Sequence, residues 1–514
     1  MNAAKFNKDQ VFDYITTADS WLNINDAFGS VRIRELMQPL IDSINDDGGV
    51  SYVLGEPKRY RTSTLATVLD ALFDVKLLPL AAVHQMQKHL YDLKDSFSPL
   101  DAADDKINKL PEDVPAWGID ETPSVWTTSM AIITLVNTGF ASNDATDRDI
   151  VRSLRDSVYW LTEQAYSDGG WGYQKYNDSD SCKSSVPMTA LAMKAIILAQ
   201  NDGQIFNFDA KSNHRFNKIT ATIQKGKEYL IQQKKEREDK YVYWEYDNKE
   251  GVSVTTWVLE TLSLLAKSSL PCYRPEDFEP LKIKIINYIY SQLPDDNGLQ
   301  SYCQSEKFFV AKKSDGLKYK PSLRDDKAFY TFKPFIISKL LDLGESPYNP
   351  KIVLIVKWLL ENREQHWIIE EYNSSSPCSI SAAMAINVIV KWLKCLSEKT
   401  FSGTVNSLIS DGPSTDDRSY TNNSLKIPIP VIFGAWVASS IFMYLPINSF
   451  LELSFVKDLA ANMFAGEKYV QVLILGAAGS ILGAIIIWLF TKIGRIILKR
   501  FHINFPGGSS DGSR

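Results

Sequence analysis

Residues 157–192 read SVYWLTEQAYSDGGWGYQKYNDSDSCKSSVPMTALA, and this stretch decides the fold. It begins with an amphipathic segment, passes through the turn Asp168-Gly-Gly-Trp-Gly-Tyr173, and ends in an apolar segment that opens at Ser185. Apolar residues at helical spacing on one side indicate an amphipathic helix, whereas apolar residues all round indicate a helix covered by others. A serine is a good N-cap for the second helix. The stretch therefore predicts an outer helix, a tight turn and a buried inner helix.

The same unit recurs along the chain. Apolar helix starts lie near Arg61, Ser124, Ser185, Val252, Asp325 and Cys378. Amphipathic segments around Ser157, Gly226, Ile286 and Val356 precede apolar ones, and turns related to the quoted one occur at Gly48–Tyr52, Trp244–Tyr246, Asn297–Tyr302 and Trp367–Tyr372. Intervals of roughly 50 to 75 residues suit two helices and their loops. The sequence predicts an all-α domain over residues 1–396, a six-repeat α/α toroid.

Two uncharged apolar segments follow this domain. Residues 427–447 and 469–490 each reach the ~20 residues that cross a bilayer core. They predict transmembrane helices joined by a short extracytoplasmic hairpin at 448–468. Gly479 and Gly483 are spaced as in close helix contacts in lipid, although glycines of this kind also occur on lipid-facing surfaces.

The charges around these segments predict the topology. The C-terminal segment 491–514 carries Lys492, Arg495, Lys499 and Arg500, and basic residues next to a span favour the cytoplasm. Two crossings then place the toroid in the cytoplasm too, on the inner membrane. The N-terminus has no apolar stretch typical of a signal peptide, so insertion depends on the C-terminal end. Residues 397–426, rich in Ser, Thr, Asn, Asp and Gly, predict a flexible linker.

The amino-acid composition limits the classes of partner that the chain is expected to bind. A formal net charge of -5 and an isoelectric point near 5.7 give no basic surface of the kind that binds nucleic acid. The 5 cysteines stand at irregular spacings, which suits free thiols in a reducing compartment better than disulfides. We expect a cytosol-facing domain whose partners are the membrane and a hydrophobic small molecule or lipid.

Gln164, Gly170 and Trp171 carry a resemblance to a known family. A glutamine followed by a glycine-tryptophan turn resembles the repeat of squalene cyclases and protein prenyltransferases, and the resemblance covers residues 10–395. It implies an α/α toroid. It also implies a central cavity for isoprenoid or other apolar ligands, lined by aromatic side chains.

The resemblance directs the search for catalytic acids. Class II cyclases use an Asp-x-Asp-Asp motif, in which a carboxyl kept protonated by its neighbours donates a proton to an alkene. The sequence lacks that motif. The paired acids Asp120-Glu121 and Asp325-Asp326 are the candidate catalytic residues. The alternative is that they cap helix N-termini and stabilise the helix dipoles.

Protein prenyltransferases imply a different site. They hold zinc with an Asp and a Cys two residues apart and a His from a later repeat. Asp180 and Cys182 match the first two ligands, but no histidine lies near the next inner helix at Ser253. The sequence therefore predicts no cofactor, with Asp180 as a helix cap and Cys182 as a small buried residue.

Aromatic residues are the candidate cavity residues: Trp126, Trp171, Tyr173, Trp244, Trp257, Tyr302 and Tyr330. Aromatic rings offer a large apolar contact area and attract cations. Trp171 and Trp244 lie in turns, where such rings also join neighbouring hairpins. Trp126, Trp257 and Tyr330 stand near inner-helix starts and are better placed to face a cavity.

Three functions are compatible with these observations. The first is a membrane-tethered toroid that binds a hydrophobic, isoprenoid-like ligand, with or without a cyclase- or prenyltransferase-like reaction. The second is a non-catalytic sensor ring that controls a two-helix membrane effector, as in bacterial antiviral defence; the effector would assemble as a homo-oligomer through its membrane helices. The third is a scaffold that recruits proteins. An open cavity with paired acids would favour an enzyme.

Overall fold

The computed structural model describes residues 5–19, 33–54, 62–94, 96–97, 108–109, 115–119, 122–140, 148–173, 184–203, 205–206, 213–246, 248–268, 270, 274–295, 299, 305–311, 327–363, 367 and 377–410. The chain divides into two units, Met1–Gly412 and Pro413–Arg514, and all described residues belong to the first. These residues form thirteen α-helices and five two-stranded antiparallel sheets. The unit is mostly helical, as the sequence predicts, and the short sheets are additions to the helices.

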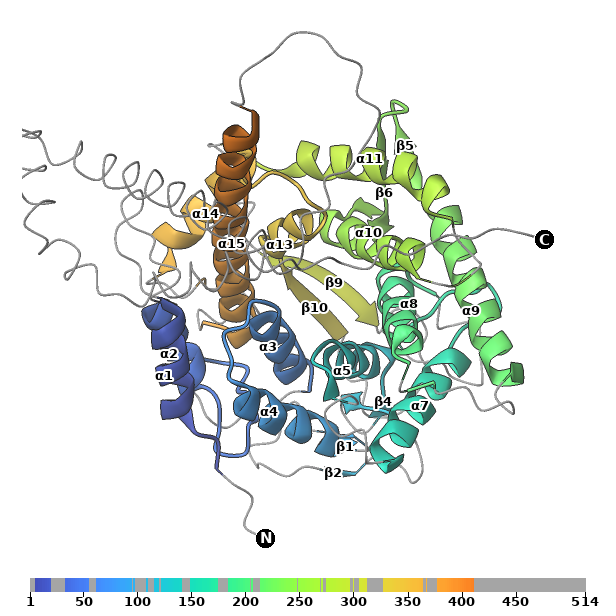
Figure 1. Ribbon diagram of the computed structural model, residues 1–514. Coiled ribbons are helices and arrows are strands. Elements are labelled where there is room, and N and C mark those ends of the chain that lie inside the picture. Colours follow the sequence, from blue (N-terminus) through green and yellow to red (C-terminus); the bar gives the residue numbers. More distant parts are fainter. Residues whose placement is uncertain are drawn as a thin grey trace, which may run out of the picture. The chain divides into compact units, whose positions relative to one another are not determined.

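Among the described residues, six apolar helices form an inner layer: α3 (Thr62–Asp74), α5 (Val125–Asn137), α8 (Val186–Asn201), α10 (Val252–Lys267), α13 (Phe335–Asp342) and α15 (Ser379–Ser410). Each packs against the next in this order, and α15 packs against α3 (Figure 1). The series is therefore a closed ring.

A second layer surrounds the first within the same described part of the chain: α2 (Ile33–Asp42), α4 (Leu80–Asp92), α7 (Arg148–Glu163), α9 (Asn213–Gln232), α11 (Pro275–Gln292) and α14 (Pro350–Glu361). Each outer helix packs against inner helices, and α1 (Lys8–Asp19) packs against α2. Outer and inner helices alternate along the chain, so the unit is an α/α toroid. The predicted toroid is confirmed.

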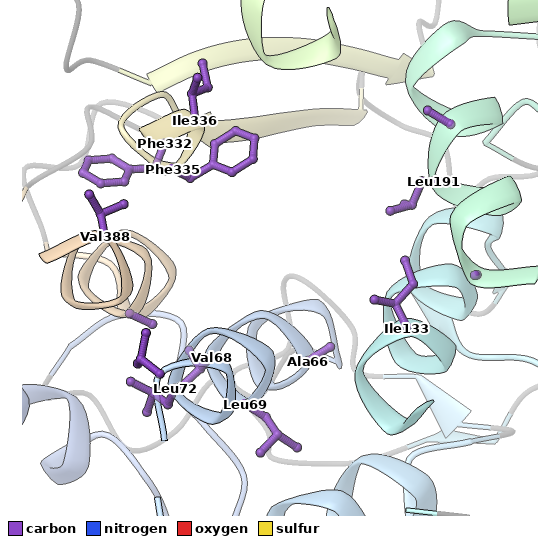
Figure 2. Packing of buried hydrophobic residues seen from close by; sticks show 14 of the residues in the cluster. Ala66, Val68, Leu69, Leu72, Ile133, Leu191, Phe332, Phe335, Ile336 and Val388 are labelled. Carbon is purple, nitrogen blue, oxygen red and sulfur yellow. The ribbon is translucent and has the colours of Figure 1, made fainter. Parts of the chain in front are cut away.

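Apolar side chains of the inner helices form the core. Figure 2 shows Val68, Ile133, Leu191, Ile336 and Val388, one from each of five inner helices, and all are buried. A fully buried aliphatic side chain contributes about 1.5–3 kcal/mol relative to an exposed one. The continuous apolar surface of these helices thus accounts for the inner layer.

The turns that lead into α5, α8 and α10 are each fixed by a tryptophan. The backbone N–H of Trp171 donates to Thr189 Oγ1 at 2.9 Å, and its indole Nε1–H donates to the Leu161 carbonyl at 2.8 Å. The indole ring of Trp171 is fully buried. Corresponding pairs of bonds join Trp117 to Thr128 and Leu90, and Trp244 to Thr255 and Leu230.

A backbone hydrogen bond that joins neighbouring repeats also closes the ring of inner helices. The backbone N–H of Val125, at the start of α5, donates to the Tyr173 carbonyl in the following repeat at 2.9 Å. Ser379, at the start of α15, donates in the same way to the Tyr52 carbonyl at 2.9 Å. The sixth repeat is therefore joined to the first by the same type of bond that joins the second repeat to the third.

Gly169 explains why the quoted turn contains glycine. Its φ is 90°, in the left-handed region that glycine adopts readily. A Cβ atom there would lie 2.5 Å from the Lys225 carbonyl oxygen on α9. Any other residue would both strain the backbone and displace the neighbouring outer helix.

The fifth repeat differs from the sequence expectation. Residues 327–332 were expected to open an inner helix, but Lys327–Phe332 is strand β10, paired with β9 (Ser305–Ala311), and α13 begins at Phe335. Aromatic residues and threonine in this segment favour a strand. The hairpin lies in the connection from α11 to α13, on the side of the ring where inner helices begin.

The other short sheets also lie in connections between helices. They are β1 (Ser96–Phe97) with β2 (Asn108–Lys109), β3 (Gly118–Ile119) with β4 (Thr122–Pro123), β5 (Lys235–Arg237) with β6 (Tyr241–Tyr243), and β7 (Glu245–Tyr246) with β8 (Lys249–Glu250). They extend the turns and leave the two helical layers intact.

The C-terminal part of the toroid is longer than expected. Helix α15 continues to Ser410, into the range 397–426 that composition predicts as a linker. Within the described residues, one helix is long and apolar enough to cross a membrane, Ser379–Ser397, and 72% of its apolar window is buried inside the ring. This segment is the core part of α15. The predicted spans 427–447 and 469–490, the hairpin 448–468 and the tail 491–514 lie outside the described residues.

Candidate functional site

A cavity of about 580 Å³ occupies the centre of the ring. All six inner helices contribute lining residues, among them Met130, Leu191, Thr256, Ser338 and Met384. Its size lies within the ~300–1,000 Å³ of small-molecule sites. The side chains of the inner helices therefore leave a central space of ligand size.

Aromatic rings line the part of the cavity near the beginnings of the inner helices. Trp126 and Trp257 have ring centroids 5.9 Å apart, and Trp257 and Phe335 have centroids 6.4 Å apart. Trp126 and Phe335 are buried. We call these three residues the aromatic layer. It offers a large apolar surface to a ligand.

Charged and amide side chains line or adjoin the other part of the cavity, toward the ends of the inner helices. They are Asp70, Asp74, Asn137, Lys194, Glu260, Lys339, Asp342, Asn387 and Lys391, and we call them the ionic belt. The exposed lining residues Asp74, Lys76 and Lys267 lie at the same helix ends. The cavity therefore opens at the C-terminal ends of the inner helices, past the ionic belt.

Glu260 joins three inner helices. Its Oε1 lies 2.6 Å from Lys194 Nζ and 3.1 Å from Lys339 Nζ, and its side chain is 24% exposed. Burial alone would raise the pKa of Glu260, but the two ammonium groups and their hydrogen bonds outweigh it and lower the pKa to about 2. Burial would lower the pKa of Lys339, yet Glu260 and nearby aspartates raise it. Both groups are charged at neutral pH.

Lys391 joins α15 to its two neighbours in the ring. Its Nζ lies 2.5 Å from an Asp74 oxygen on α3 and 2.6 Å from an Asp342 oxygen on α13. Asn387, one turn earlier, donates to Asp74 at 2.9 Å and accepts from Ser338 at 2.7 Å. Burial would raise the pKa of Asp74, but Lys391 and Asn387 outweigh it and lower the pKa. Asp74 is therefore ionised as well.

These groups limit the chemistry of the described lining. A proton donor for an alkene or a leaving group must keep its proton near neutral pH, which requires a raised carboxyl pKa. Glu260 and Asp74 have lowered pKa values instead. Partly buried ion pairs are a weak source of stability, because desolvation offsets their attraction.

The belt follows a sequence register. Asp70, Lys194, Glu260 and Asn387 each lie eight residues after the first residue of their helix. A polar residue at this position of an otherwise apolar helix was the signal that could have identified the belt. Reading each helix alone hides it, because one polar residue per helix is unremarkable.

The predicted aromatic residues separate into two groups. Trp126 and Trp257 line the cavity. Trp171 and Trp244 are fully buried in their turns, and Tyr173 accepts a backbone bond from Val125; these three are outside the cavity lining. The hydrogen bonds of Trp171 and Trp244 show that these residues join hairpins.

All of the predicted catalytic and metal residues lie outside the described residues: Asp120, Glu121, Asp180, Cys182, Asp325 and Asp326. The predicted cavity residue Tyr302 also lies outside them. Tyr330 belongs to β10, and its role in binding stays a prediction. In the described part of the chain, no group of three or more His, Cys, Asp or Glu residues could hold a metal ion.

Comparison with known proteins gives distant structural likenesses. No protein-family model matches the chain, and no curated protein matches it. Similar solved structures include an inactive α-1,6-mannanase variant, GH76A of Salegentibacter sp. HEL1_6, in complex with α-1,6-mannotriose (12% identity, TM-score 0.41, covering 76% of this chain and 100% of that one). Another is a family 76 glycoside hydrolase from a bovine Bacteroides thetaiotaomicron strain (10% identity, TM-score 0.40, covering 76% and 78%). The fold assignment rests on the closed ring itself.

Proposed function

We propose that the toroid is a ligand-binding domain and that its cavity receives a hydrophobic or lipid-like small molecule with a polar end. The observation that carries this proposal is the aromatic layer and the ionic belt within one cavity. An apolar body placed against Trp126, Trp257 and Phe335 leaves water, while a polar end reaches charged groups near the opening. Burial of apolar surface supplies the affinity, at about 25 cal/mol per Å².

The charges of the cavity favour binding without a reaction. A cyclase-like step needs a protonated carboxyl, and Glu260 and Asp74 are held ionised by lysines. Lys339 is likewise held in its charged form, so it is no nucleophile. We therefore favour ligand binding over a cyclase- or prenyltransferase-like activity as the function of the cavity.

We further propose that residues 427–447 and 469–490 tether the ring to the cytoplasmic face of the inner membrane. Both segments are uncharged and long enough to span a bilayer. A tether of this kind would keep the cavity close to a ligand that partitions into lipid.

Helix α15 favours a second function, a sensor ring that controls a two-helix membrane effector. Met384 and Asn387 line the cavity, and the same helix continues to Ser410. A helix is a stiff rod that rises about 1.5 Å per residue, so a shift in the cavity wall would be carried toward the proposed spans. Bacterial antiviral effectors that disrupt membranes would use such a connection.

Native mass spectrometry of the full chain in mild detergent, with extraction of retained molecules, tests the binding function. We expect a lipid-like molecule to be retained. Trp257→Leu should lower its occupancy about tenfold, which corresponds to the loss of ~1.4 kcal/mol of binding free energy. Trp358→Leu, on outer helix α14, is the matched control and should leave occupancy unchanged.

An empty wild-type chain, or equal occupancy in both variants, would overturn the binding function. For the sensor function, dye release from vesicles that contain the full chain should change when the extracted molecule is added. No change in dye release on addition would remove the sensor function and leave binding in place.

A further inference from the structure

Three inner helices end in the same type of C-cap. The second residue after the helix end has a left-handed backbone: Lys76 after α3 (φ 57°), Gly139 after α5 (φ 73°) and Gly344 after α13 (φ 87°). The N–H of Lys76 donates to the Phe73 carbonyl at 2.9 Å, and the next N–H, from Leu77, donates to Leu72 at 3.0 Å. Gly344 and Glu345 make the corresponding pair of bonds to Leu341 and Leu340. The caps of α3 and α13 therefore match, with lysine in place of glycine.

Lysine is a poor choice for this position on structural grounds. Only glycine adopts the left-handed region without steric strain between Cβ and the backbone, which is why it dominates such caps. Residues held in this region cluster at functional sites, where the surrounding structure fixes them. The lysine side chain at this cap lines the opening of the central cavity.

A second lysine lies on the opposite side of the opening. Lys267 is the last residue of α10 and also lines the cavity, and α10 is three helices away from α3 in the ring of six described inner helices. Both lysines are exposed. Among the described residues, neither Lys76 nor Lys267 has a hydrogen-bond or ion-pair partner for its ammonium group.

The lining carboxylates differ from these two lysines. Asp70 accepts a bond from Asn137 at 2.9 Å, Asp74 and Asp342 pair with Lys391, and Glu260 pairs with Lys194 and Lys339. The acids of the cavity are thus engaged within the protein, while two cations at its opening are available. With Lys391 included, five lysines and four carboxylates among the described residues lie at the cavity, so the net charge that remains for a ligand is positive by one.

We propose that Lys76 and Lys267 bind the anionic head of an amphipathic ligand whose apolar part lies against the aromatic layer. This inference rests on the binding function proposed above and adds the charge of the ligand. A carboxylate head and a phosphate head both accept charge-assisted hydrogen bonds from ammonium groups. A lysine near a helix C-terminus also stabilises the helix dipole, but that role does not require a left-handed residue.

The test compares short amphiphiles with similar tails and different heads. The full chain, held in phosphatidylcholine nanodiscs, is titrated calorimetrically with octyl phosphate, octanoate, octyltrimethylammonium and octyl glucoside, and empty nanodiscs are subtracted. We expect an anionic amphiphile to bind at least about fivefold more tightly than the cationic and neutral ones. Its advantage should shrink at high salt, because exposed charges are screened.

Substitutions at Lys76 separate recognition from structure. Lys76→Gly should weaken binding of the anionic amphiphile about fivefold and raise the Tm by roughly 1–2 °C, because it relieves backbone strain. Lys76→Ala should weaken binding without raising the Tm, and Lys76→Arg should retain binding. Lys267→Gln should weaken binding, whereas Lys88→Gln, an exposed lysine on outer helix α4, should not.

The outcomes are distinguishable. Tightest binding of octyltrimethylammonium, or equal binding of all heads with no effect of the lysine variants, would overturn the anionic site and leave the binding function in place. If no amphiphile binds and Trp257→Leu releases no retained molecule, both the anionic site and the binding function fail. A Lys76→Gly variant that gains stability and keeps full affinity for the anionic amphiphile would also overturn the anionic site.

Discussion

The N-terminal and C-terminal ends of the inner helices differ in how closely their contacts repeat from one helix to the next. At the N-terminal ends, three of the described repeats use the same contacts: a turn tryptophan bonded to a threonine of the inner helix and to a carbonyl of the outer helix. At the C-terminal ends, each helix carries its own polar residues, such as Asp74 on α3, Lys267 on α10 and Asp342 on α13. The contacts that repeat hold the toroid together, whereas the side chains that differ between repeats determine which chemical groups line the cavity.

Gly169→Ala should produce the largest effect and would break the repeating end. Its Cβ would lie 2.5 Å from the Lys225 carbonyl oxygen at a left-handed φ, so we expect a loss of roughly 4 kcal/mol in the free energy of unfolding. Gly344→Ala, at a C-terminal end with open space around it, should lose only about 1 kcal/mol through strain. Urea unfolding followed by tryptophan fluorescence measures both. Equal losses would show that the turn at Gly169 tolerates displacement of α9.

Glu260→Gln is the next largest change and tests the diverging end. It leaves Lys194 and Lys339 opposite a neutral amide, and we expect a loss of about 2 kcal/mol at pH 7 because the site is partly exposed. Glu163→Gln removes the exposed pair with Lys218 and should change stability by less than about 0.5 kcal/mol. A Glu260→Gln protein as stable as the wild type would mean that the belt contributes nothing to the fold.

The same residue predicts a pH dependence. The pKa of Glu260 is about 2 in the folded protein and 4.5 ordinarily, so its ionised form stabilises the fold. This contribution is complete above pH 4.5 and is lost as the pH falls from 4.5 through about 2. The Tm difference between wild type and Glu260→Gln should therefore shrink over that range. A constant difference would contradict the lowered pKa.

Trp171→Phe and Trp126→Phe sharpen the comparison with the smallest effects. Trp171→Phe removes the indole bond to the Leu161 carbonyl and should cost about 1–2 kcal/mol of stability without changing ligand occupancy. Trp126→Phe keeps an aromatic ring in the cavity wall and should change stability by less than about 1 kcal/mol while lowering occupancy. Thermal unfolding and native mass spectrometry distinguish the two. The reverse pattern would assign the turn tryptophan to the ligand.

The toroid could be predicted because its determinants are local and repeated. The turn Asp168–Tyr173 and the apolar segment from Ser185 fix one hairpin, and related patterns occur in the other repeats. The fifth repeat was misplaced, because Lys327–Phe332 has the apolar content of an inner helix but the aromatic and threonine content of a strand.

The cavity could be predicted only in part. Trp126 and Trp257 stand close to helix starts, and the structure places both in the lining. The ionic belt was missed, because its members come from different helices and meet only when the ring closes. Lys76 was missed for another reason: the strain that marks it is a backbone angle, which the sequence of an exposed lysine does not reveal.

The closing contact between Ser379 and the first turn also governs when the site comes into existence. Ser379 Oγ donates to the Ser51 carbonyl across 328 residues of chain, so α15 is the last wall of the cavity to be synthesised. A nascent chain that lacks it has an open arc of hairpins with exposed apolar surface, which invites aggregation or chaperone binding. A ligand that needs the closed ring binds only after translation has passed α15, and it then favours the closed state over the open one by mass action.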